Sequence, residues 1–124
     1  MSECPIQVHV DTQYLPDQSE PTKGKHAFAY RITIENIGSE TSQLISRKWL
    51  ITDANQSRKE VQGIGVVGEQ PIIPPGQHYQ YTSGVVLDTE VGTMEGYYQM
   101  VTESGVAFDA PIPPFLLAVP GSVH

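Results

Sequence analysis

The sequence has 124 residues, the usual size of one domain with its own hydrophobic core, and 39% of its residues are hydrophobic against 17% charged. Seven Lys and Arg residues against 14 Asp and Glu residues give a net charge of −7, so nucleic acid and anionic membranes would repel the chain. The composition therefore predicts one folded domain over residues 1–124 that binds neither of them.

The single cysteine and the short apolar runs indicate the cellular compartment of the protein. Cys4 is the single cysteine and cannot form an internal disulfide, and residues 1–10 lack the basic and apolar stretches of a signal peptide. The longest fully apolar run, residues 115–119, is far shorter than the roughly 20 residues of a membrane-spanning helix. These features predict a cytoplasmic protein without membrane insertion.

In the first half of the chain, hydrophobic residues alternate with polar ones, which is the pattern of half-buried β-strands. The third strand is expected to place Ile45, Trp49 and Ile51 on one face, because side chains two apart in a strand point the same way. The pattern predicts strands over residues 6–14, 26–37, 43–52 and 59–63, with a polar loop over 15–25 and turns over 38–41 and 53–58.

The second half continues in the same way after a segment rich in glycine and proline. Residues 63–76 contain three prolines, which exclude a long helix. A strand beginning near Tyr79 is followed by a turn at Gly92 and by a strand that contains Met94 and Tyr98. A last strand starts near residue 106 and is interrupted by the proline pair at 113–114.

Seven or eight strands without a helix predict an all-β antiparallel sandwich. A tryptophan on the third strand, Trp49, and a glycine corner leading into paired tyrosines at residues 96–98 are typical of fibronectin type III and immunoglobulin-like domains. A small barrel is the alternative architecture for the same strands.

Residues 63–68 read Gly-Ile-Gly-Val-Val-Gly and match the spacing of a dinucleotide-binding loop. In that fold the loop opens a helix whose amino terminus binds the pyrophosphate, whereas three prolines follow here by residue 75. No Lys-Ser or Lys-Thr pair follows the last glycine, as a phosphate loop would need. The glycines therefore favour a tight turn or bulge between strands.

Metal and catalytic sites find little support in the sequence. His9 and Asp11 project from one strand face, but two ligands are too few for a metal site. Neither Cys4 nor Ser83 stands in the local sequence of a catalytic nucleophile. We therefore expect no catalytic residue, no metal site and no cofactor, and a chain that is not an enzyme.

Several segments together resemble the bacterial ApaG family. The resemblance is carried by residues 63–71, Pro75-Gly76, residues 81–84, residues 92–94 and Gly96-Tyr97. Residues 28–36, Gln43-Leu44 and residues 49–55 upstream agree with it, as does the ending from Ile112-Pro113 to Phe115. The sequence departs from the family pattern at Lys48, where relatives often have His, at Gln56, where a turn glycine is usual, and at Glu90, where proline is common.

This resemblance implies a fibronectin type III-like sandwich and a link to cobalt resistance and magnesium homeostasis, without an agreed mechanism. Related domains fused into eukaryotic proteins look like interaction modules, so we expect a cytoplasmic module that binds an unidentified protein, with homo-oligomerisation left open. The alternative is a phosphate- or nucleotide-binding protein or enzyme that uses the glycine-rich loop.

The same loop is the candidate recognition surface, because loops on a sandwich carry exposed side chains whose ends the sheets fix in place. The candidate partner-binding residues are Gly63, Gly65, Gly68, Glu69 and Gln70. The glycines are expected to shape a rigid loop, and Glu69 and Gln70 to be the polar groups that face the partner.

Overall fold

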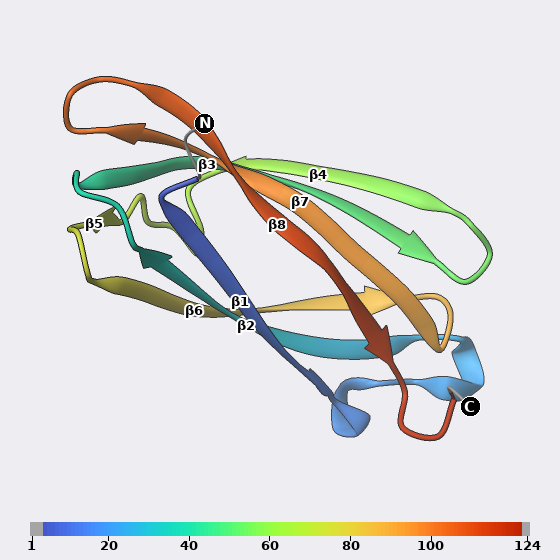
Figure 1. The fold of residues 1–124 in the computed structure, drawn as a ribbon. Coiled ribbons are helices and arrows are strands. Elements are labelled where there is room, and N and C mark those ends of the chain that lie inside the picture. Colours follow the sequence, from blue (N-terminus) through green and yellow to red (C-terminus); the bar gives the residue numbers. More distant parts are fainter. Residues whose placement is uncertain (1–3, 123–124) are drawn as a thin grey trace.

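A computed structural model describes residues 4–122 as an all-β structure with eight strands and two short 3₁₀ turns, η1 (Pro16–Gln18) and η2 (Pro21–Lys23) (Figure 1). The strands are β1 (Ile6–Tyr14), β2 (His26–Asn36), β3 (Ser42–Asp53), β4 (Arg58–Ile64), β5 (Ile72–Ile73), β6 (His78–Leu87), β7 (Val91–Thr102) and β8 (Ala107–Ala118). Every strand that the alternation predicts is present.

The strands form two antiparallel sheets, so the predicted sandwich is confirmed. One sheet has the order β1-β2-β6, and the other has the order β4-β3-β7-β8 with the short β5 also paired to β3. The edge strands β1 and β8 pack beside each other, which closes one side of the sandwich. The edge strands β4 and β6 therefore lie on the opposite side (Figure 1).

Trp49 of β3 lies in the middle of the core between the two sheets and is 2% exposed. Its ring meets Tyr30 edge-on with ring centres 5.5 Å apart, and it meets Phe115 and Tyr98 in the same way at 5.8 and 6.5 Å. Edge-to-face contacts of this kind add about 1 kcal/mol each beyond the burial of apolar surface. The tryptophan predicted on the third strand is thus a central core residue.

A β-bulge in β3 corrects the predicted face of that strand. The register with β7 shifts between Leu44 and Ser46, so Leu44 is fully buried and Ile45 is only partly buried. One extra residue reverses the alternation on one side of the bulge. The expectation that Ile45 shares the core face of Trp49 was therefore wrong.

Two turn assignments were also wrong. Gly92 lies inside β7 as the partner of Asp53, and the chain turns earlier, at residues 88–90. Residues 96–98 also lie inside β7 and not at a corner. A Cβ atom at Gly96 would lie 1.9 Å from the carbonyl oxygen of Lys48, so this glycine allows two backbones to approach closely.

The proline pair in β8 causes the predicted interruption of the ladder. Met94 pairs with Phe115, but Gly96 pairs with Ile112, so residues 113–114 face one residue of β7. Proline cannot donate to a ladder and is found in sheets at edges and bulges. Among residues 4–122, no helix is long and apolar enough to cross a membrane.

Candidate functional site

The five predicted site residues lie together in the segment that connects the end of β4 to β5, the short strand that pairs with β3. We call residues 63–70 the glycine loop. Gly63 is the second-to-last residue of β4, and Gly65, Gly68, Glu69 and Gln70 follow before Pro71. Contacts with β3 and β6 hold the loop in place, and each of its three glycines serves a different structural purpose.

Gly63 leaves room for an arginine. It pairs with Arg47 of β3, and a Cβ atom at residue 63 would lie 2.6 Å from Nη1 of Arg47. That guanidinium donates to the carbonyl oxygen of Gly65 at 2.7 Å and to that of Ile64 at 3.4 Å. Arg47 therefore crosses the face of Gly63 and ties the start of the glycine loop to β3.

Gly65 makes the sharp turn out of β4. Its φ angle is +68°, in the left-handed region that L side chains rarely adopt, and a Cβ atom would lie 2.3 Å from the carbonyl oxygen of Glu69. Its amide N–H donates to the carbonyl oxygen of Ile45 at 2.8 Å. Both the backbone angle and the close contact require glycine here.

A tight hairpin forms the tip of the loop. The amide of Val66 donates to the carbonyl of Glu69 at 2.8 Å, and the amide of Glu69 donates back to Val66 at 3.0 Å. The two residues between them, Val67 and Gly68, have φ angles of 44° and 82°, the pattern of a type I′ turn. Glycine and asparagine suit such a turn, whereas the β-branched Val67 is a strained exception.

Glu69 and Gln70 are exposed, as expected, but each also holds the loop in place. The hydroxyl of Tyr79 donates to Oε2 of Glu69 at 3.1 Å, which fastens the loop to β6. Desolvation raises the pKa of Tyr79 above its usual value, and the hydrogen bond to Glu69 and the charge of Glu69 raise it further. Nε2 of Gln70 donates to the carbonyl of Ile45 at 3.0 Å.

The same hydrogen bonds argue against a phosphate cradle. A cradle needs several backbone N–H groups that point at the anion. In the glycine loop the amides of Gly65, Val66 and Glu69 already donate to carbonyl oxygens of the chain. The loop leads into β5 and not into a helix, and Glu69 adds a negative charge beside it.

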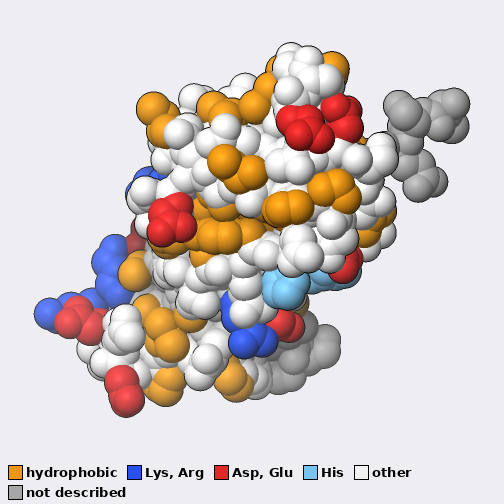
Figure 2. All heavy atoms as spheres, turned by 90° about the vertical axis from the view of Figure 1, so that its left-hand side faces the viewer, with side chains coloured by type: hydrophobic (Ala, Val, Ile, Leu, Met, Phe, Trp, Pro, Cys, Tyr) orange, Lys and Arg blue, Asp and Glu red, His pale blue; other side chains and the backbone are white. Residues whose placement is uncertain are grey.

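Exposed hydrophobic side chains lie in the loop and just after it, and sequence reasoning missed them. Ile64 is 78% exposed, Val67 56% and Ile72 64%. Figure 2 shows hydrophobic side chains gathered over the end of the sandwich where β5 and the β7–β8 turn lie. The signal in the sequence was the run of apolar residues in a segment too short and too rich in glycine to bury them all.

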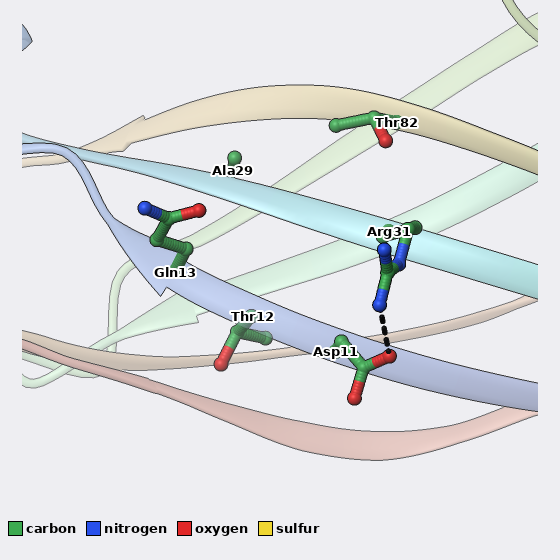
Figure 3. Close-up of a pocket in the computed structure, with 6 residues that line it drawn as sticks. All are labelled: Asp11, Thr12, Gln13, Ala29, Arg31 and Thr82. Carbon is green, nitrogen blue, oxygen red and sulfur yellow. Dashed lines mark hydrogen bonds and ion pairs between the residues drawn. The ribbon is translucent and has the colours of Figure 1, made fainter.

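The histidine and aspartate of β1 lie on the outer face of the small sheet. Asp11 pairs with Arg31 at 3.2 Å, and His9 lies 4.0 Å from Glu35. Asp11 and Arg31 line a hollow of about 460 Å³ together with Thr12, Gln13, Ala29 and Thr82. Figure 3 shows these six residues and the ion pair that joins Asp11 to Arg31. Within residues 4–122, no group of three or more His, Cys, Asp or Glu side chains is placed to hold a metal ion.

A family model for the ApaG domain matches residues 16–102 of the chain. The chain belongs to the ApaG family. It is 58% identical over 119 residues to Protein ApaG from Pseudomonas paraeruginosa, covering 96% of this chain and 94% of that one. It is 53% identical to Protein ApaG from Ralstonia nicotianae over the full length of both chains.

Solved structures agree with this assignment to the ApaG family. The crystal structure of the putative ApaA protein from Bordetella pertussis has a TM-score of 0.91 and 47% identity, covering 94% of this chain and 95% of that one. An X-ray structure of a Northeast Structural Genomics Consortium target has a TM-score of 0.92 and 55% identity, covering 97% of this chain and 91% of that one. The sandwich described above is thus the fold of this family.

Proposed function

We propose that the chain is a non-enzymatic, cytoplasmic protein-binding module whose recognition surface is the glycine loop, including its exposed apolar residues Ile64 and Val67. The observation that carries the proposal is the strained backbone of Val67 at the tip of the loop. Backbone hydrogen bonds to Ile45 and between Val66 and Glu69 hold the rest of the loop in place. Backbone strain of about 1–3 kcal/mol persists in native proteins chiefly at functional sites. A rigid tip with an apolar side chain suits protein recognition, because little conformational freedom is lost on binding.

The polar groups of the loop complement this tip. Glu69 and Gln70 are exposed while one hydrogen bond each fixes their position. A partner would meet an apolar centre, formed by Ile64 and Val67, with a polar rim, which is the common anatomy of protein interfaces. The link of the family to cobalt and magnesium homeostasis would then be indirect and would act through the partner.

A matched pair of variants tests the proposal in a pull-down from bacterial lysate. Val67→Asp places a charge at the tip of the loop, and Val106→Asp places one at a turn residue of similar exposure, 58%. The proposal predicts that the wild type and Val106→Asp capture partner proteins from the lysate. Val67→Asp and the double variant Glu69→Ala, Gln70→Ala should fail to capture these partners. Equal retention by all four folded proteins would remove the loop from recognition.

A further inference from the structure

The outer edge of β6 differs from the other sheet edges of the molecule. Exposed edges offer unpaired N–H and C=O groups, and proteins protect them with charges, prolines, bulges or covering segments. β4 carries Arg58, Lys59 and Glu60, and β1 and β8 pack beside each other. β8 also contains three prolines and a bulge. Three of the four long edge strands are thus protected.

β6 lacks the charges, prolines and bulges of the other edges. Its sequence, HYQYTSGVVL, contains no Lys, Arg, Asp, Glu or Pro, and it pairs with β2 without a register shift. Within residues 4–122, its backbone makes no backbone hydrogen bond outside the ladder with β2. Every second residue from Gln80 to Val86 is exposed. A long, regular and uncharged edge of this kind is a template for one more strand.

A hollow with a basic rim lies at the end of this edge. It has a volume of about 580 Å³ and lies between β4 and the end of β6. We call it the basic hollow. Its lining residues are Lys25, Ile51, Asp53, Ser57, Arg58, Lys59, Val86, Leu87 and Asp88. Three of the seven Lys and Arg residues of a chain with net charge −7 thus meet at one place.

The charges in the basic hollow are only partly neutralised. Lys25 pairs with Asp88 at 2.5 Å, and Asp53 accepts hydrogen bonds from the backbone of its own turn. The hydrogen bond from Lys25 and the charges of Lys25 and Lys59 lower the pKa of Asp88. Among the described residues, neither Arg58 nor Lys59 has a carboxylate within 4.0 Å. The hollow is therefore able to accept a further carboxylate.

From these observations we infer that the β6 edge binds an extended segment of a partner protein as an added antiparallel strand. Acidic residues at the amino-terminal end of that segment bind in the basic hollow. β6 runs toward the hollow, so an antiparallel strand begins there. The inward side chains of the added strand would lie against Val85 and Val61, which are partly buried against the core. These side chains of the added strand should therefore be apolar. The inference rests on the proposed role as a binding module but uses a surface other than the glycine loop.

A synthetic octapeptide, acetyl-Glu-Glu-Val-Thr-Val-Thr-Val-Thr-amide, probes the edge in a titration followed by backbone amide NMR. We expect shift changes confined to β6 and to the rim of the basic hollow, and we expect the binding to weaken with salt. Replacing the two Glu residues of the peptide with Lys should weaken binding at least about tenfold. Shift changes centred on another strand would overturn the inference.

Two versions of the peptide test for main-chain pairing. One is N-methylated at its three Val residues and the other at its three Thr residues. Successive N–H groups of a strand point to opposite sides, so only one set can donate to β6. Strand addition predicts that one version loses binding and the other keeps it. If both versions bind alike, the peptide does not pair through its backbone and the inference fails.

Charge reversal in the protein tests the hollow. Arg58→Glu with Lys59→Glu should weaken the acidic peptide at least about tenfold and should strengthen the Lys peptide. Lys48→Glu, on the outer face of the large sheet, is the control and should leave both affinities unchanged. Unchanged binding by the charge-reversed, folded protein would contradict the inference.

Two further measurements separate this inference from the proposed function and from self-association. Glu69→Ala with Gln70→Ala should leave the peptide affinity unchanged, because Glu69 meets β6 at Tyr79, at the end opposite the basic hollow, and a loss would show that the peptide binds the loop. Shift changes in β6 that depend on protein concentration without peptide would assign the edge to a second copy of the chain and would overturn the inference.

Discussion

The guanidinium group of Arg47 occupies the space that a side chain at Gly63 would need, with Nη1 only 2.6 Å from the position of the missing Cβ atom. The two residues face each other across β3 and β4. The first glycine of the loop is therefore explained by a neighbouring strand and not by a bound phosphate.

This relationship predicts a double-mutant cycle. Gly63→Ala should lower the free energy of unfolding by about 1–3 kcal/mol, because the new methyl group displaces the guanidinium from Gly65. In an Arg47→Ala background the same change should cost less than half as much. Chemical denaturation of the four proteins measures both costs. Equal costs in both backgrounds would show that Arg47 is not the obstacle.

Relief of strain at the loop tip is predicted to stabilise the protein. Val67→Asn creates the Asn-Gly pair that a type I′ turn favours, so the free energy of unfolding should rise by about 1 kcal/mol. Val106→Asn, at a residue without a positive φ angle, should change it by less than about 0.5 kcal/mol. Thermal and denaturant melts compare the two. If Val67 serves recognition, the stabilised variant should also bind its partner less tightly.

The buried tyrosine pair of the core predicts an alkaline dependence of stability. The hydroxyls of Tyr81 and Tyr98 lie 2.5 Å apart, and desolvation raises the pKa of each well above its usual value. The folded state therefore holds these protons more tightly than the unfolded state, in which the pKa is about 10. Stability should be constant from this source below about pH 10 and should fall above it, by about 1.4 kcal/mol per pH unit for each tyrosine.

Phenylalanine substitutions identify the source of that slope. The double variant Tyr81→Phe, Tyr98→Phe should lose the part of the alkaline slope that these two groups supply. It should also cost less stability at pH 7 than the sum of the single variants, since each single change leaves one buried hydroxyl without its partner. An unchanged slope in the double variant would assign alkaline unfolding to other groups.

Cobalt and magnesium are predicted to bind weakly and independently of β1. Changing both His9 and Asp11 to Ala should leave the affinity for either ion within about twofold of wild type, because Arg31 already pairs with Asp11 and repels a cation there. Isothermal titration calorimetry measures this directly. A tenfold loss of affinity would reveal a metal site that includes these residues.

Local alternation in the sequence was enough to predict the strands, because each strand has one face toward the core. It failed where one strand gains a residue. The bulge at Ile45 depends on how β3 meets β7, and the turn before Gly92 depends on which strands become neighbours. Gln56, where a family glycine is usual, has a φ angle of 67°, so the departure seen in the sequence marks a real left-handed residue.

The candidate site was predictable only in part, for the same reason. Glycine spacing indicated the loop between β4 and β5, and the prolines that follow excluded a helix. The contacts of Glu69 with Tyr79 and of Gly63 with Arg47 join residues 10 and 16 positions apart in the sequence, in different elements of the fold. Such partners are set by sheet topology, which the pattern of single strands does not contain.

Site-specific photocrosslinking in growing bacteria tests most directly whether the glycine loop is a recognition surface. A benzoylphenylalanine placed at Ile64, near the start of the loop, is compared with one at Val106, at the β7–β8 turn; both native side chains are more than half exposed. The loop hypothesis predicts a discrete crosslinked protein from residue 64 that is absent from residue 106 and is lost on adding Glu69→Ala with Gln70→Ala. No crosslink from residue 64, or the same crosslinks from both residues, would contradict it.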